Sequence, residues 1–204
     1  MCGRSVPTPI GSALVAALAM MASMALGGTS ALAHTGLEHA VSFTAGFQHP
    51  WTGLDHLLAM VAVGLWAGLN GGRALWVWPA AFVGIMIAGS ALGMTGVALP
   101  MVEPGILASV IVLGLLVLSG LRVPVVAGAV LIAAFAVLHG HAHGAELPAE
   151  SAAISYIAGF ALATAALHAI GLGIARLARN DWGRSLVRAS GAVVALVGVV
   201  LAAF

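Results

Sequence analysis

Residues 104–138 read PGILASVIVLGLLVLSGLRVPVVAGAVLIAAFAVL, and Arg122 is the only charged residue among them. A helix of about 20 apolar residues crosses the roughly 30 Å hydrocarbon core of a bilayer. The stretch has an apolar segment on each side of Arg122, and Gly120 and Pro124 mark a turn between them. The pattern therefore predicts two consecutive transmembrane helices joined by a short loop.

The composition extends this prediction to the whole chain of 204 residues, of which 62% are hydrophobic and 6% charged. A soluble domain carries about 25% charged residues. The net charge of +1 and the lack of a basic run argue against a nucleic-acid partner. We expect an all-α, polytopic membrane helix bundle in contact with lipid. Its six predicted spans are approximately Trp51–Leu69, Ala74–Thr95, Pro104–Leu121, Val123–Leu138, Ala152–Ala175 and Leu186–Phe204.

The N-terminus has the features of a secretory signal peptide. Arg4 provides a positive charge, residues 10–26 form an apolar core, and Ala31-Leu-Ala33 is an A-x-A cleavage site. We therefore predict a signal peptide at residues 1–33 and a permease domain at residues 34–204. An uncleaved first membrane helix is the alternative.

Cleavage would change the metal-binding chemistry of the mature chain. Cys2, the single cysteine, would leave with the signal peptide, so no thiolate ligand would remain. His34 would become the first residue, and its α-amine and imidazole could chelate a metal ion together. His34 is therefore a candidate ligand that depends entirely on the cleavage site.

The arginines predict the orientation of the bundle. After the signal segment, they fall only in the connections that follow the first, third and fifth spans, whereas the opposite connections contain Glu103, Glu146 and Glu150. Arginine is enriched in cytoplasmic loops. We expect a bacterial inner-membrane protein whose mature N- and C-termini both lie on the periplasmic side. The six arginines are Arg73, Arg122, Arg176, Arg179, Arg184 and Arg188.

Two histidine-rich segments are the strongest functional signal. Residues 49–56 read HPWTGLDH at the start of the first span, and residues 139–146 read HGHAHGAE at the end of the fourth. The predicted topology brings both segments to the outer side. Ionisable residues within membrane segments are costly to bury and are functional candidates by default.

The helical spacing within these segments indicates a metal site. His139, His143 and Glu146 occupy positions i, i+4 and i+7, and so share one helix face if the helix extends that far. His56 and Met60 are likewise four residues apart. Imidazole and carboxylate ligands together suit nickel, cobalt, zinc or copper(II).

Each candidate also has an ordinary structural interpretation. Asp55 could be an N-terminal capping carboxylate three residues after Thr52. His139 could hydrogen-bond a neighbouring backbone. His168, inside the fifth span, could bond a neighbouring helix or form a second metal stop on an inward path. We expect His39 and His141 to be solvated and Met60 to belong to the core.

The two segments resemble motifs of the HupE/UreJ family of bacterial nickel and cobalt permeases. Residues 49–56 match the pattern H-P-x-x-G-x-D-H. Residues 138–146 resemble F-H-G-x-A-H-G-x-E with leucine in the first position, and residues 159–171 resemble the fifth-span pattern. The resemblance covers essentially the whole chain. It implies a metal site made of His49, Asp55, His56, His139, His143 and Glu146.

The resemblance also implies a function. Members of this family take up nickel, sometimes cobalt, for hydrogenase or urease maturation. We therefore expect a secondary permease, with no prosthetic cofactor, whose transported ligand is Ni²⁺ or Co²⁺. The sequence contains no P-loop for nucleotide hydrolysis. The residues leave open an intramembrane metalloenzyme or a metal-binding sensor as alternatives, and also whether the bundle forms a homo-oligomer.

Overall fold

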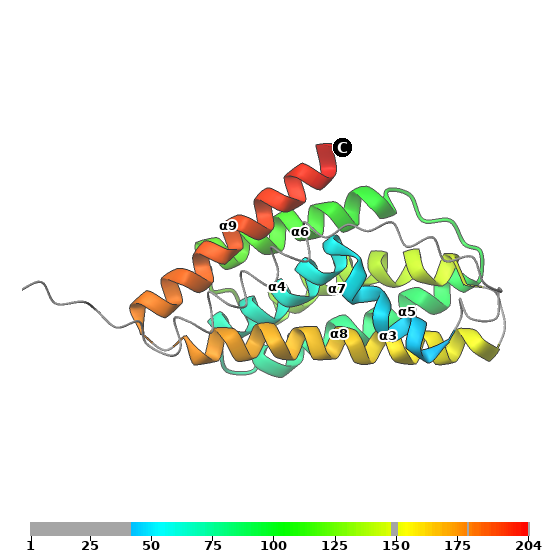
Figure 1. Cartoon of the computed structure of the whole chain (residues 1–204), viewed down its shortest axis with the longest axis horizontal. Helices are drawn as coiled ribbons and strands as arrows, with labels where there is room; N and C mark the ends of the chain where they lie inside the picture. The colour runs from blue at the N-terminus through cyan, green and yellow to red at the C-terminus, as the bar shows by residue number, and fades with distance from the viewer. Residues whose placement is uncertain (1–41, 148–150, 179, 204) are drawn as a thin grey trace, which may run out of the picture.

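The computed structural model describes residues 42–147, 151–178 and 180–203, and within them every regular element is an α-helix (Figure 1). This confirms the all-α prediction. The signal peptide, His34, His39, Glu150 and Arg179 lie outside the described residues. The helices are α3 (Phe43–Thr52), α4 (Leu54–Asn70), α5 (Ala74–Met94), α6 (Val102–Ser119), α7 (Val125–Ala145), α8 (Ser151–Leu177) and α9 (Asp181–Ala203).

The helices agree with the predicted spans except at two functionally important places. Among the described residues, α5 to α9 are each long and apolar enough to cross a membrane, and the pair α3 and α4 makes a sixth candidate span bent by 83°. The first span is therefore broken at Gly53 rather than continuous from Trp51. The fourth continues to Ala145, beyond the predicted end at Leu138, and so carries the second histidine segment as helix.

Helix α4 lies at the centre of the bundle. Residues 56–67 are all buried, and α4 contacts α3, α5, α6, α8 and α9. Large apolar side chains cover the outside of the other helices, with Val126 74%, Ile154 72% and Leu196 65% exposed. A water-soluble protein rarely exposes so much contiguous apolar surface. The arrangement fits a bundle whose outer surface faces lipid.

Glycines set the close approach of neighbouring helices. A Cβ atom added at Gly64 would overlap the carbonyl oxygen of His168, and one at Gly68 would lie 2.5 Å from the Cβ of Ala175, so α4 and α8 touch through their backbones. Gly89 and Gly93 bring α5 equally close to α7. Small residues at this spacing allow such contacts in lipid. These two glycine pairs therefore have a packing role.

Hydrogen bonds fasten the arginine-bearing end of the bundle. Trp66 Nε1 donates to the carbonyl of Leu121 at 3.0 Å, and the backbone N–H of Val123 donates to Asn70 Oδ1 at 3.2 Å. Both bonds tie the end of α4 to the connection between α6 and α7. The indole rings of Trp66 and Trp78 stack beside them with centroids 4.2 Å apart. This end is consequently held by directional contacts as well as by packing.

Candidate metal site

The bend between α3 and α4 creates the framework of the site. Gly53 ends α3 in an extended conformation, with φ −84° and ψ 113°, and its carbonyl accepts the first hydrogen bond of α4. A Cβ atom at this position would lie 3.1 Å from Nδ1 of His56 and 3.2 Å from Oδ1 of Asp55. Glycine therefore permits the bend and leaves space for these two side chains. Discontinuous membrane helices of this kind often carry ion sites in transporters.

Asp55 fixes the orientation of His56. Its Oδ1 accepts a hydrogen bond from the backbone N–H of His56 at 2.9 Å and another from the ring Nδ1 at 2.8 Å. A carboxylate has no hydrogen to give, so Nδ1 carries the hydrogen and Nε2 of the neutral ring has a free lone pair. Carboxylate–histidine pairs of this kind orient metal ligands and increase their basicity. Thr52 instead donates to the carbonyl of His49, so it does not form the proposed capping arrangement with Asp55.

His143 brings the two sequence motifs into direct contact. Its Nε2 lies 2.7 Å from Nε2 of His56, although the residues are 87 positions apart. Since His56 Nε2 accepts in its neutral form, the hydrogen of this bond belongs to His143. Both side chains are buried. The prediction that two remote segments converge is confirmed for this pair.

His139 contributes an unpaired nitrogen next to this pair. Its Nδ1 lies 3.0 Å from the carbonyl oxygen of Phe135, which can only accept, so Nδ1 carries the hydrogen and Nε2 has the lone pair. That Nε2 is fully buried and has no partner among the described residues. Its ring centroid is 5.1 Å from that of His56. Buried polar atoms without a partner are rare and require an explanation such as a ligand.

His49 completes a group of four imidazoles. It lies in the last turn of α3, with its ring centroid 4.5 Å from that of His143 and 5.8 Å from that of His56. The structure therefore brings together five of the predicted site residues. We call this group the histidine cluster; its members are His49, Asp55, His56, His139 and His143.

The cluster is close to, but not in, a metal-binding geometry. Among the described residues, no three His, Cys, Asp or Glu side chains are already arranged to hold a metal ion. Two imidazole nitrogens that share one ion at about 2.0–2.1 Å lie about 2.8–3.4 Å apart when their angle at the metal is about 90–109°. The 2.7 Å separation of His56 and His143 must therefore widen by only a few tenths of an ångström. For both Nε2 atoms to bind one ion, the hydrogen on His143 Nε2 would have to move to its Nδ1, which is buried without a partner among the described residues.

Two polar residues of the second motif do not join the cluster. Glu146 lies in the turn after α7 with an exposed side chain, and among the described residues it makes no hydrogen bond or ion pair with a histidine. His141 was expected to be solvated, and this expectation is wrong. It is 5% exposed and its Nε2 donates to the carbonyl of Val97 at 2.6 Å. The cause is the continuation of α7, which points His141 toward the α5–α6 connection.

His168 lies beyond an aromatic side chain that the sequence did not single out. Both ring nitrogens of His168 are buried without partners among the described residues, so it does not make the predicted bond to a neighbouring helix. The Phe82 ring lies 5.5 Å from the His139 ring and 5.1 Å from the His168 ring, between centroids. Phe82 therefore contacts both histidines. In the sequence, Phe82 is one aromatic residue in an apolar segment, and nothing else there indicates that it contacts the histidines.

Phe160 provides a second aromatic wall, on the α8 side of the cluster. Its ring centroid lies 4.4 Å from that of His143 and 6.0 Å from that of His49. It was already part of the family-like pattern at residues 159–171, although no role was predicted for it. The histidine cluster is thus enclosed by aromatic rings from α5 and α8.

A comparison with known proteins identifies the same family as the sequence motifs do. The family model described as HupE / UreJ protein matches residues 20–201. The chain belongs to the HupE/UreJ family. It is 48% identical over 169 residues to "Protein HupE" of Rhizobium leguminosarum bv. viciae, an alignment that covers 83% of this chain and 88% of that protein. No solved structure matches the chain. The HupE/UreJ family is of a transporter type rather than an enzyme family, and this member is a multi-pass membrane protein.

Proposed function

We propose that this protein is a secondary permease that carries Ni²⁺, or Co²⁺, across the bacterial inner membrane toward the cytoplasm, for metalloenzyme maturation. The observation that supports it best is the buried, unpartnered Nε2 of His139 beside the hydrogen-bonded pair of His56 and His143. Neutral imidazole rings, which offer a nitrogen lone pair, are suitable ligands for nickel and cobalt. The association of the HupE/UreJ family with nickel and cobalt uptake supports the same cargo.

The ligands of the histidine cluster suit reversible binding, which transport of an ion requires. The imidazoles are neutral ligands, and Asp55 contributes its negative charge through His56 rather than by enclosing the ion. An inside-negative potential favours inward movement of a divalent cation by roughly 4–5 kcal/mol per 100 mV, twice the value for one charge. The membrane potential can therefore drive uptake without nucleotide hydrolysis.

The path inward continues from the histidine cluster to His168. Phe82 contacts both His139 and His168, so an ion that moves between them has to displace or pass this ring. We propose that His168 is a second, weaker stop, with Phe82 separating the two stops. In this scheme the cluster captures the ion and His168 is required for its onward movement.

Metal flux in proteoliposomes tests the proposal. The purified full chain is reconstituted with an inside-negative potential, and entry of nickel-63 is measured. We expect flux for the native chain, loss of both Ni²⁺ binding and flux for His139→Ala, and near-native binding but loss of flux for His168→Ala. Gln48→Ala changes an exposed side chain next to His49 and is the matched control, with native behaviour expected.

The same assay separates transport from the alternatives. A native chain that binds Ni²⁺ but produces no flux under any potential would refute the permease and favour a metal-binding or sensor protein. Competition by Co²⁺, Zn²⁺ and Cu²⁺ in the flux assay identifies the preferred cargo. Equal flux for the native chain and His139→Ala would remove the histidine cluster from the mechanism.

A further inference from the structure

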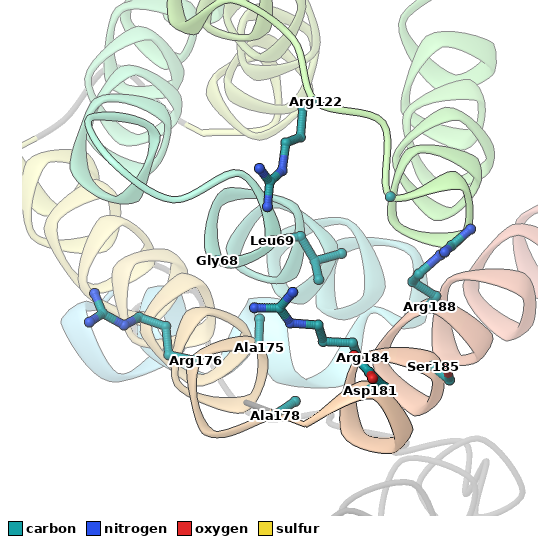
Figure 2. Close-up of a pocket in the computed structure, with 11 residues that line it drawn as sticks. Gly68, Leu69, Arg122, Ala175, Arg176, Ala178, Asp181, Arg184, Ser185 and Arg188 are labelled. Carbon is teal, nitrogen blue, oxygen red and sulfur yellow. The ribbon is translucent and has the colours of Figure 1, made fainter.

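A cavity lies away from the histidine cluster, at the opposite end of the bundle. It has a volume of about 450 Å³ and is lined by the ends of α4, α6, α8 and α9 (Figure 2). We call it the arginine cavity because four of its lining residues are arginines, whereas Asp181 is the only carboxylate among them. The four are Arg122, Arg176, Arg184 and Arg188. The arginine distribution predicts that this end faces the cytoplasm.

Three different parts of the chain supply these arginines. Arg122 comes from the α6–α7 connection, Arg176 from the end of α8, and Arg184 and Arg188 from the first turns of α9. In Figure 2, the side chains of Arg122 and Arg184 extend toward each other over Leu69, while Arg176 and Arg188 lie at opposite edges. Membrane orientation requires arginines near the helix ends, but it does not require them to surround one hollow.

The cavity is held in shape by hydrogen bonds. The residues on either side of Arg122 are both bonded to α4, through Trp66 and Asn70. Arg188 Nε donates to the carbonyl of Leu118 at 2.8 Å, and its remaining N–H groups stay available. Gly120, with φ +62°, allows this approach, because a Cβ there would lie 3.3 Å from Arg188 Nε. The positive groups are therefore positioned by the fold.

The charge of the cavity is not balanced by the chain in the described ranges 42–147, 151–178 and 180–203. Within these ranges, none of the cavity arginines has a carboxylate oxygen within 4.0 Å. Arginine does not lose its proton in proteins, so it cannot relieve the repulsion by becoming neutral. An anion with several acceptor oxygens would relieve it, and arginine binds phosphate through two parallel hydrogen bonds.

We propose that the arginine cavity binds the phosphate group of an anionic ligand. Basic pockets between membrane helices on the cytoplasmic side bind anionic lipid headgroups. A volume of about 450 Å³ falls within the range of small-molecule sites. An anionic phospholipid of the inner leaflet and a free phosphate ion offer the same chemistry, and the experiment below distinguishes them. This site does not depend on the metal-uptake proposal.

The test measures lipid and phosphate binding to the purified full chain by native mass spectrometry. Phosphatidylglycerol, phosphatidylcholine and inorganic phosphate are titrated separately. The single variants Arg122→Gln and Arg184→Gln and the double variant Arg122→Gln/Arg184→Gln are compared with Arg73→Gln, which removes one positive charge at the same end, as each single variant does. Arg73 lies over the exposed Trp76 ring at 5.9 Å and does not line the cavity.

We expect phosphatidylglycerol to bind the native chain more tightly than phosphatidylcholine. Each cavity arginine should contribute about five-fold in affinity, equivalent to about 1 kcal/mol, so the double variant should bind about thirty-fold more weakly. Arg73→Gln should bind as the native chain does. If inorganic phosphate binds with the same dependence and phosphatidylglycerol does not, the phosphate site stands and its ligand is a free anion.

A loss in Arg73→Gln as large as that in each single cavity variant would overturn the proposal, because the effect would then be one of general surface charge. Unchanged binding in the double variant would overturn it as well. Thermal unfolding of the same preparations reports whether the bundle is folded. Should the double variant fail to fold, Arg184→Gln alone carries the test with its five-fold expectation, since Arg184 makes no side-chain hydrogen bond in the described structure.

Discussion

Asp55 offers the sharpest test of the histidine cluster, because its two interpretations predict different measurements. Its Oδ1 accepts hydrogen bonds from the backbone and the ring of His56, at 2.9 and 2.8 Å. As a ligand-orienting carboxylate, it should control metal affinity. As a charge in the first turn of α4, it should only stabilise the helix, by about 0.3–1 kcal/mol through the helix dipole.

Two substitutions separate the contributions of charge and orientation. Asp55→Asn retains an acceptor oxygen and can keep the His56 ring in place, but it removes the negative charge. Asp55→Ala removes both. Loss of a second-shell partner costs about 10–100-fold in metal affinity. We expect the asparagine variant near the lower value and the alanine variant near the upper one, about 1.4 and 2.7 kcal/mol respectively.

Isothermal titration of the purified chain with Ni²⁺ provides the measurement. Asp181→Asn is the matched control, because it makes the same chemical change in the first turn of α9 at the other end of the bundle. It should leave Ni²⁺ affinity unchanged. Thermal unfolding in the absence of metal is recorded in parallel. Native affinity in Asp55→Ala, with only a lower unfolding temperature, would establish the capping role and refute the assignment to the metal site.

Three further predictions concern packing, His141 and pH. Gly140→Ala should destabilise the bundle by about 1–3 kcal/mol in thermal unfolding, because a Cβ there overlaps the carbonyl of Met86, whereas Gly84→Ala, with no atom within 4 Å, should not. His141→Ala should lower stability by about 1 kcal/mol through loss of its bond to Val97, yet retain Ni²⁺ affinity; a loss of affinity would mean that His141 is a ligand. Nickel-63 uptake should decrease as the external solution is made more acidic, since protons compete with the metal for imidazole nitrogens, and uptake that rises on acidification would contradict histidine ligation.

The membrane bundle could be predicted from sequence because its signal is distributed over many residues. Each span requires only a long run of apolar side chains, and the described helices from α5 to α9 begin and end within a few residues of the predicted spans, apart from the longer end of α7 and the earlier start of α9. The glycine pairs can also be recognised in the sequence, since their spacing places the two members of each pair on a common helix face. The bend at Gly53 was not predicted: the expected first span began at Trp51 and was continuous, whereas α3 already includes Pro50 and ends at Thr52.

The residue types of the candidate site could be predicted from their metal-binding chemistry. Which of these residues lie in the site depends on three-dimensional packing, which the spacing of residues in the sequence does not determine. Positions i, i+4 and i+7 place Glu146 on the face of His139 and His143 only while the helix lasts, and α7 ends at Ala145. His141 is buried by a contact with a connection 44 residues away. Phe82 depends in the same way on how α5 and α7 pack. Such contacts between remote segments leave no local pattern in the sequence.

The packing also constrains how the histidine cluster can admit an ion. Backbone contacts at glycines hold α5 against α7 and α4 against α8, so α4 and α7, which carry His56, His139 and His143, are each closely packed against a neighbouring helix. The required opening between His56 and His143 is only a few tenths of an ångström, which side-chain rotation can supply. Helix α3 is different, since it is a short segment of 10 residues that joins α4 through Gly53. His49, which α3 carries, is therefore the member of the cluster best placed to move when an ion enters.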